Sequence, residues 1–321
     1  MRALSGASLV AAVVVLSSAI GCSQFGQLQA MKSFKSANQS YQQQDYKKAS
    51  ALYEEAIKAN PDLNQAYFFL ANSLDQQYKP ARKGEEANDA FLARAVDYYQ
   101  QAADRLGASP SPEDKKIGKL ALEYLVAAYG VDKLNDPAKA EPVVQKMIQI
   151  EPGEPSNYHA LAKIYEDAGA YPEAEQMLVY AKAAKPNDPA VYMQLAGFYN
   201  RQADFDKTID ALAQRATVEP NNPEAFFTIS TYYWDNAQRN PLLTEADKRS
   251  QVEKGLEAVN KALQIKGDYM EALVYKGLLL RVQANMEKDA TKQASLIKEA
   301  TALKDQAEEI KKKRTAGAAG N

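Results

Sequence analysis

The chain carries few side chains of the kinds that perform covalent chemistry. It contains one histidine, His159, and one cysteine, Cys22, so neither a zinc site of Cys and His ligands nor an internal disulfide can form. We find no glycine-rich phosphate loop, GxSxG turn, HExxH pair or EF-hand loop. Acidic pairs such as Glu54-Glu55 stand in polar helical patterns and are interpreted as solvated charges. We predict a non-enzymatic protein without cofactor or metal; the alternative is an enzyme with a site in an insertion.

The N-terminal segment has the features of an export signal. Arg2 precedes an apolar run over residues 9–16, and Ala19-Ile20-Gly21 ends at Cys22. This arrangement resembles the lipobox of bacterial lipoproteins, which implies cleavage after residue 21 and lipidation of Cys22. An ordinary cleavable signal followed by a coincidental cysteine is the alternative. Ser23 in place of Asp resembles lipoproteins passed on to an outer membrane. We therefore expect a cell-envelope protein, lipid-anchored in the outer membrane and facing the periplasm.

Charge composition argues against a nucleic-acid partner. The chain has 39 Lys and Arg against 41 Asp and Glu, for a formal net charge of −2. Sequence-independent binding to nucleic acid depends on a concentrated basic surface, and this balance does not indicate one. The basic run over residues 311–314 is interpreted as solubilising, with contact to anionic headgroups as the alternative.

The elements that organise the chain repeat every 34 residues. Two segments align column by column over residues 155–220. The first holds Tyr158, Leu161, Ala162, Tyr165, Gly169, Tyr171, Ala174, Leu178, Ala181 and Pro186, and the second holds Tyr192, Leu195, Ala196, Tyr199, Ala203, Phe205, Thr208, Leu212, Arg215 and Pro220. Spacings of i, i+3, i+4 and i+7 place the first four residues of each line on one stripe of a helix. The remaining columns predict a second helix after a short turn.

These columns resemble the tetratricopeptide repeat family, whose unit of 34 residues is a pair of antiparallel helices. The resemblance implies an all-α fold, a right-handed superhelical solenoid of about seven helix-turn-helix units with a C-terminal capping helix. Stacking is part of such a fold, because one hairpin cannot bury its apolar face alone.

The columns extend, less regularly, through most of the chain. We assign residues 1–21 to the signal peptide, 22–30 to a tether, 31–314 to the solenoid and 315–321 to a disordered tail. The expected units are 31–63, 64–108, 113–153, 155–188, 189–222, 223–269 and 270–314. Two insertions, near 75–88 and 235–250, interrupt the second and sixth units; we favour a tolerated surface loop or helix extension for the first.

The family resemblance also implies a binding surface. In the family, the first helix of each unit lines a concave face, and fixed positions on it meet a ligand. The positions carried over here are Phe34, Asn38, Tyr41, Phe68, Asn72, His159, Lys163, Met193, Asn200, Phe227, Thr231, Trp234, Val274 and Arg281. Several are aromatic or amide side chains, which are common in protein-binding patches. Packing of these aromatics against one another is the alternative for Phe68, Phe227 and Trp234.

Together these features predict a scaffold or adaptor that binds a partner protein or peptide on its concave surface. The resemblance implies tasks such as the assembly of outer-membrane, pilus or secretion machinery. Phe34 and Phe68 occupy positions where the family's clamp for C-terminal carboxylates would want lysine, which argues against that clamp. A periplasmic peptide- or glycan-binding module that supports an envelope enzyme is the alternative function.

Overall fold

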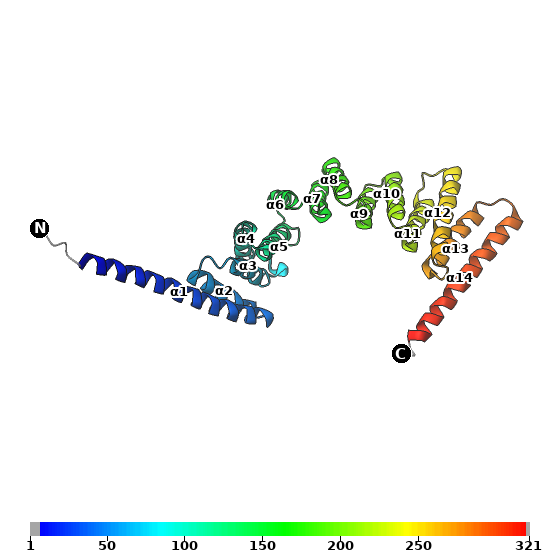
Figure 1. Ribbon diagram of the computed structural model, residues 1–321. Helices are drawn as coiled ribbons and strands as arrows, with labels where there is room; N and C mark the ends of the chain where they lie inside the picture. The colour runs from blue at the N-terminus through cyan, green and yellow to red at the C-terminus, as the bar shows by residue number, and fades with distance from the viewer. Residues whose placement is uncertain (1–6, 319–321) are drawn as a thin grey trace. The chain divides into compact units, whose positions relative to one another are not determined.

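The regular structure of the chain is helical throughout the part that the computed structural model describes, namely the backbone of residues 7–318 and the side chains of residues 25–315. Figure 1 shows the helices following one another as antiparallel pairs. Their bounds are α1 Ala7–Gln42, α2 Tyr46–Ala59, α3 Asn64–Asp75, the 3-10 helix η1 Pro80–Arg82, α4 Glu86–Gly107, α5 Pro112–Tyr129, α6 Pro137–Ile150, α7 Pro155–Asp167, α8 Tyr171–Ala184, α9 Pro189–Arg201, α10 Phe205–Val218, α11 Pro223–Arg239, α12 Glu245–Ile265, α13 Met270–Asn285 and α14 Ala290–Ala318. The predicted all-α fold of helix-turn-helix repeats is confirmed.

The hairpins gather into two compact units. The unit Met1–Pro152 holds the pairs α1/α2, α3/α4 and α5/α6, and the unit Gly153–Asn321 holds the pairs from α7/α8 to α13/α14. Within each unit, the second helix of one hairpin contacts the first helix of the next, as α4 contacts α5 and α12 contacts α13. The apolar face of each hairpin is thereby covered by its neighbour, as stacking of repeats requires.

A repeated cap sets where the first helices begin. Asp188 accepts a hydrogen bond from the amide of Ala190 at 2.9 Å, and Asn222 accepts one from Glu224 at 3.0 Å. Pro189 and Pro223 follow these caps as the first helical residues. Proline suits that position, since its missing N–H would have no helical acceptor there. The sequence therefore fixes the starts of α9 and α11 through the same local chemistry.

The prolines that close the repeats have a second role in the structure. The Tyr192 hydroxyl donates to the carbonyl oxygen of Pro186 at 2.7 Å, and Tyr67 donates to Pro61 at 3.1 Å. In both cases the tyrosine lies six residues after the proline and belongs to the next hairpin. The proline of the repeat therefore has two roles. It ends a helix, and its carbonyl oxygen accepts a hydrogen bond that connects one hairpin to the next.

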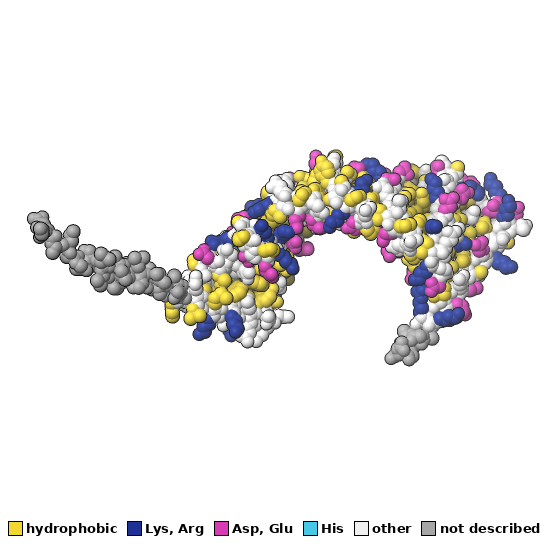
Figure 2. Space-filling view, viewed as in Figure 1, with side chains coloured by type: hydrophobic (Ala, Val, Ile, Leu, Met, Phe, Trp, Pro, Cys, Tyr) yellow, Lys and Arg dark blue, Asp and Glu magenta, His cyan; other side chains and the backbone are white. Residues whose placement is uncertain are grey.

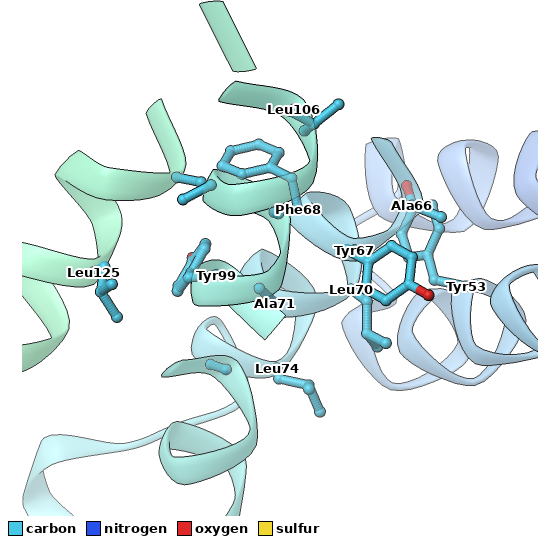
Figure 3. Packing of buried hydrophobic residues seen from close by; sticks show 14 of the residues in the cluster. Tyr53, Ala66, Tyr67, Phe68, Leu70, Ala71, Leu74, Tyr99, Leu106 and Leu125 are labelled. Atoms are coloured by element: carbon cyan, nitrogen blue, oxygen red, sulfur yellow. The ribbon is translucent and has the colours of Figure 1, made fainter. Parts of the chain in front are cut away.

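The core of the first unit combines alanine columns with stacked aromatic rings. Figure 3 shows Tyr53, Phe68 and Tyr99 among buried aliphatic side chains such as Leu70, Leu106 and Leu125. Alanines such as Ala71 and Ala102 are fully buried, which lets neighbouring helices approach closely while the larger rings fill the space beside them. The second unit has clusters of the same kind around Leu195 and Leu212 and around Val252 and Val259.

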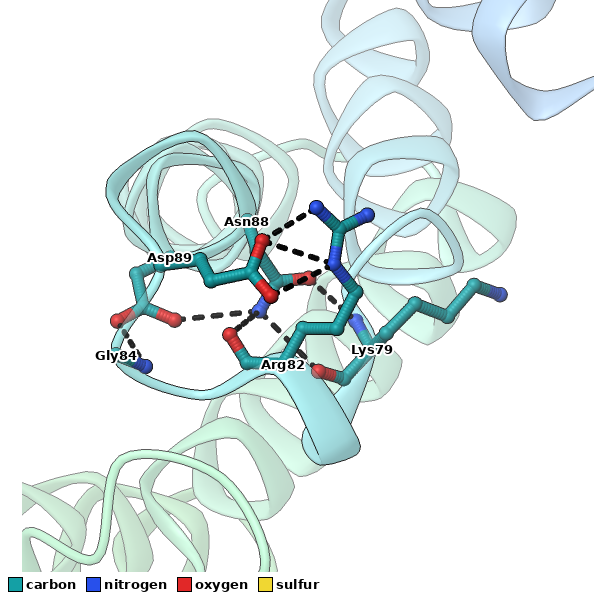
Figure 4. Close-up of polar contacts among 6 residues, drawn as sticks. Lys79, Arg82, Gly84, Asn88 and Asp89 are labelled. Carbon is teal, nitrogen blue, oxygen red and sulfur yellow. Dashed lines mark hydrogen bonds and ion pairs between the residues drawn. The ribbon is translucent and has the colours of Figure 1, made fainter.

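The insertion between α3 and α4 is an ordered loop. Tyr78, which is buried, packs against Leu92 and Ala128 beneath it. The Asn88 side chain closes the loop, accepting from the amide of Lys79 at 2.8 Å and donating to the carbonyls of Lys79 and Arg82 at 3.2 and 3.1 Å (Figure 4). These bonds satisfy backbone groups that a loop would otherwise leave to solvent.

The second insertion, predicted near 235–250, consists largely of added helix. Helix α11 has 17 residues and α12 has 21, whereas the corresponding α9 and α10 have 13 and 14. Thr244 and Asp247 form a capping box that starts α12 after a short turn. The extension carries Arg239 at the end of α11, next to the cavity described below.

At its two ends the structure differs from the expected tether and tail. Residues 22–30 are part of helix α1, and Ala30 is buried. Helix α14 continues through Ala318, so residues 315–318 are helical rather than a disordered tail. Most of the signal segment and the Cys22 side chain lie outside what the structure describes in side-chain detail. Of the helices within the described residues, none combines the length and apolar character needed to cross a membrane.

Candidate functional site in the second unit

A cavity of about 310 Å³ lies where the first helices of three successive hairpins meet in the unit Gly153–Asn321. Helix α9 contributes one residue to its lining, α11 contributes five and α13 contributes one. The lining residues are Asn200, Thr231, Tyr232, Trp234, Asp235, Arg239 and Tyr275. Three of the predicted binding residues, Asn200, Thr231 and Trp234, are therefore brought together in one cavity.

Aromatic rings form the rigid part of this site. The Trp234 and Tyr275 rings meet edge to face with centroids 5.4 Å apart, and Phe227 meets Tyr275 at 5.2 Å. Phe227 also contacts Tyr269 at 5.1 Å. Such edge-to-face contacts hold each ring in place. The cavity therefore presents a preformed aromatic wall.

Polar groups complete the lining without a net charge. The Arg239 guanidinium pairs with the Asp235 carboxylate at 2.8 Å, so the two formal charges offset each other. Asn200 is exposed and its amide can both donate and accept hydrogen bonds. The Thr231 hydroxyl donates to the backbone carbonyl of Thr228 at 2.7 Å and keeps an acceptor site. This chemistry suits a neutral or mixed polar-apolar segment rather than a free carboxylate.

Tyr275 is the main residue that the sequence analysis missed. It is the sixth residue of α13, whereas the predicted binding residues of α11, Phe227, Thr231 and Trp234, are the fifth, ninth and twelfth residues of their helix. Val274 and Arg281 are the fifth and twelfth residues of α13, so the last hairpin was assigned in the same register as the others, and that register does not include Tyr275. Asp235 and Arg239 follow the twelfth residue of α11 and were not predicted either, and Arg239 belongs to the extension of that helix.

The structure contradicts the assignment of Phe68 and Asn72 to an open groove. Phe68 is 5% exposed and packs against Phe69, Tyr99 and Tyr124. Asn72 is 2% exposed and donates to the Tyr99 hydroxyl at 3.2 Å. Both belong to the core of the first unit, because the neighbouring hairpin covers the face that the family register treats as open.

Three more predicted residues of the first unit are held in contacts within the fold. The Tyr41 hydroxyl donates to Asn72 at 2.5 Å, and Asn38 accepts from the Tyr53 hydroxyl at 2.6 Å. Phe34 meets the Tyr53 ring at 5.7 Å. All three are half-buried, and their ring and hydrogen-bonding groups serve internal packing. The predicted groove of the first unit is thus occupied largely by its own side chains.

The remaining predicted residues lie in the second unit, apart from the cavity lining. Lys163 forms an ion pair with Asp167, and Met193 places its sulfur 3.1 Å from the buried Arg215 guanidinium. Val274 and Arg281 line a different groove, between α13 and α14. Phe227 does not line the cavity, but its ring packs against Tyr275, which does.

His159 is half-buried, and its surroundings disfavour the charged form. Burial lowers the pKa of His159 below its ordinary value of 6.5, and the Arg201 guanidinium lowers it further. Glu166 acts in the opposite direction but is itself engaged by Arg201, whose two nitrogens lie 2.7 and 2.9 Å from its oxygens. Lys163 adds to the lowering. The imidazole is therefore neutral at neutral pH.

This depressed pKa predicts a loss of stability in mild acid. Because the unfolded chain takes up a proton near the ordinary pKa and the folded chain only below it, the stabilisation is fully present above pH 6.5 and is lost as pH falls through the folded pKa. Urea unfolding between about pH 7 and pH 5 is expected to show this fall, and His159→Gln should flatten it. An unchanged slope in the variant would place the titrating group elsewhere.

Among the residues that line the cavity, Asp235 is the single acidic side chain, and the lining holds no histidine or cysteine. Among the described residues, no three His, Cys, Asp or Glu side chains come together as possible ligands. Figure 2 shows Lys and Arg side chains interspersed with Asp and Glu over the visible face, in keeping with the balanced composition. The arrangement in the cavity can bind and orient a ligand through aromatic contact and hydrogen bonds.

The stacked hairpins define a helical-repeat protein. Residues 133–196 match the family model described as tetratricopeptide repeat. The comparison with curated proteins finds no match. Among solved structures, the C-terminal part of a TPR repeat-containing protein from Cytophaga hutchinsonii is similar, with 13% identity, a TM-score of 0.54 and coverage of 86% of this chain and 98% of that one. The fold of this chain is accordingly that of tetratricopeptide repeat proteins.

Two further structures resemble the chain at lower TM-scores. A tetratricopeptide repeat protein from Parabacteroides merdae has 13% identity and a TM-score of 0.44, with coverage of 85% of this chain and 99% of that one. PilW, described as a widely conserved type IV pilus biogenesis factor, has 16% identity and a TM-score of 0.40, with coverage of 76% and 96%.

Proposed function

We propose that the chain is a non-enzymatic scaffold of the bacterial cell envelope that binds a partner protein through the cavity between α9, α11 and α13. The observation that carries the proposal is the convergence of Asn200, Thr231, Trp234 and Tyr275 from three hairpins at one preformed cavity. Aromatic anchors beside hydrogen-bonding groups are the usual make-up of interface hot spots. Because the rings already support one another, little ordering is required on binding.

The envelope location rests on the N-terminal sequence. The small residues before Cys22 support lipidation at that cysteine, and Ser23 supports transfer to the outer membrane. Several acyl chains attached there would hold the protein at a bilayer, since each buried methylene contributes about 0.8 kcal/mol. A scaffold anchored in this way would present its binding surface to the periplasm. Metabolic labelling with a palmitate analogue tests it: wild type should be labelled and Cys22→Ser should not.

Site-specific photo-crosslinking in the native organism tests the binding surface directly. A crosslinker at Asn200 lies at the cavity, whereas the same crosslinker at Asn260 lies on α12 away from it, and both asparagines are exposed. We expect a discrete protein adduct from position 200 and none from position 260. Equal adducts from both positions, or none from either, would contradict the proposal.

Truncating the aromatic anchor should weaken capture of the crosslinked partner strongly. Trp234→Ala removes the ring that faces Tyr275, and loss of such an anchor costs about 2 kcal/mol, or roughly thirtyfold in affinity. Tyr171→Ala is the control, because Tyr171 is an exposed aromatic on α8 outside the cavity. Trp234 is also the single tryptophan of the chain, so its fluorescence should report occupancy in wild type. Equal affinities for the two variants would exclude the cavity as the binding site.

The polar lining keeps a glycan-binding module as the second candidate. Flat aromatic rings next to an amide, a hydroxyl and the Asp235–Arg239 pair could also contact a saccharide. Titration of the tryptophan fluorescence with peptidoglycan fragments separates the two functions. A saturable change with these fragments, together with no protein adduct at position 200, would favour glycan binding.

A further inference from the structure

A second groove, distinct from the cavity above, lies between the last two helices. It has a volume of about 390 Å³. Helix α13 lines it with Met270, Val274, Gly277, Leu278 and Arg281, and α14 lines it with Ala300, Lys304, Ala307, Glu308 and Lys311. Both sets follow the same spacing of i, i+4, i+7, i+8 and i+11. The groove therefore runs along about three turns of two helices, or roughly 16 Å.

Small residues form the floor of this groove. Gly277, Ala300 and Ala307 are buried, and a Cβ atom at Gly277 would lie 3.2 Å from the carbonyl oxygen of Ala300. The two backbones are thus in close contact at this point. The walls are apolar and partly open, with Val274 40% exposed.

In two preceding hairpins, the groove between the two helices of the hairpin is covered by the first helix of the next hairpin. Helix α13 contacts both α11 and α12, and in the first unit α5 contacts both α3 and α4. In each case the first helix of a hairpin lies against both helices of the hairpin before it. No helix of the described chain covers α13 and α14 in the same way. The groove therefore has the dimensions and small-residue floor of a site for one further helix.

The charges at the rim of the groove indicate whether a partner protein or a second copy of this chain would occupy it. The lining holds Arg281, Lys304 and Lys311 against one acidic residue, Glu308, whose carboxylate lies 3.5 Å from Lys304. Two such faces brought together would oppose like charges, which is unfavourable at an interface. A helix with acidic residues flanking its apolar stripe would instead pair with the basic rim.

We propose that the groove between α13 and α14 binds an acidic amphipathic helix of a partner protein, which would extend the stack of hairpins by one helix. The apolar stripe of that helix would contact Val274 and Leu278, and its carboxylates would face Lys304 and Lys311. This mode is helix-in-groove recognition, with anchors at helical spacing. It does not depend on the cavity at Trp234.

Crosslinking at Val274 in the full-length protein in its native organism tests the inference. The matched control is Ile297, which is 42% exposed on α14 but does not line the groove. Mass spectrometry of the adduct identifies the crosslinked segment. The expected result is a segment of another protein with apolar residues at i, i+3 or i+4 and i+7 and a net negative charge. A segment of this chain, a basic segment or the absence of an adduct specific to position 274 would overturn the proposal.

Charge reversal provides the second arm of the experiment. Lys304→Glu combined with Lys311→Glu should reduce the yield of that adduct at least about tenfold, because like charges would then face each other. Lys298→Glu, an exposed substitution on α14 outside the groove, should leave the yield unchanged. An adduct that persists in the double variant would show that the basic rim does not select the partner. An adduct lost at position 274 but kept at position 200 would separate this groove from the proposed scaffold cavity.

Discussion

Replacing Tyr99 by alanine is expected to lower the stability of the first unit by about 3–5 kcal/mol, because it removes a large, fully buried ring. The ring stacks on Tyr124 with centroids 5.5 Å apart and meets Phe68 at 6.0 Å. Its hydroxyl accepts from Asn72 at 3.2 Å and donates to Asp75 at 3.4 Å. Burial and the nearby Asp75 carboxylate raise the pKa of Tyr99, so the hydroxyl remains a donor.

Hydrogen exchange of the α3–α5 amides, together with urea unfolding, measures this effect where it arises. Tyr98→Ala serves as the control, since the adjacent tyrosine is only half-buried and should cost clearly less. Tyr99→Phe keeps the ring and isolates the hydroxyl, with an expected cost of about 1–3 kcal/mol from an unsatisfied Asn72. Equal losses for Tyr98→Ala and Tyr99→Ala would contradict the described core.

Replacing Lys133 by methionine is expected to cost about 3–5 kcal/mol, because it leaves a buried carboxylate without the positive charge that neutralises it. The Lys133 ammonium lies 2.5 and 2.7 Å from the two oxygens of Asp75, whose side chain is 4% exposed. Lys133 belongs to the turn between α5 and α6, and Asp75 is the last residue of α3. The pair therefore joins two consecutive hairpins through residues that are 58 positions apart in the chain.

Two comparisons make the ion-pair prediction specific. Lys139→Met should leave the stability nearly unchanged, because the Lys139 side chain is 67% exposed and its pair with Asp136 is solvated. Adding Asp75→Asn to Lys133→Met should recover part of the loss, since it removes the uncompensated charge. Thermal unfolding of the four proteins gives the comparison. A further loss in the double variant would show that burial of the Asp75 charge is not the cause.

Local sequence predicted the hairpins because the information for them is local. The spacing of Tyr158, Leu161, Ala162 and Tyr165 places all four on one face of a helix. A capping residue followed by proline fixes where the next helix begins. Columns at a period of 34 then require each hairpin to cover the next. Helix type, pairing and the absence of recognisable catalytic motifs could therefore be derived without coordinates. Within the described residues, the seven pairs of helices agree with the expected fold of about seven helix-turn-helix units.

The candidate site could be predicted only in part. Asn200, Thr231 and Trp234 were found by their columns, and they do meet in one cavity. The same columns failed for Phe68 and Asn72, which the neighbouring α4 and α5 bury through Tyr99 and Tyr124. Whether a column faces solvent depends on how closely the following hairpin packs, and that depends on residues some 30–60 positions away. Tyr275 was missed because it is the sixth residue of α13, outside the positions that the family register marks as ligand-facing.

By itself, the amino-acid sequence determined the repeat and the helix starts, because each of these depends on spacing within a few turns of chain. Only the tertiary structure decided which first-helix residues line a cavity and which fill the core. It also showed that the turn around Lys133 anchors a buried carboxylate on α3, and that α13 and α14 present matched stripes to an open groove. Those properties arise from contacts between hairpins, whose geometry is set by side-chain volumes and charges on two elements at once.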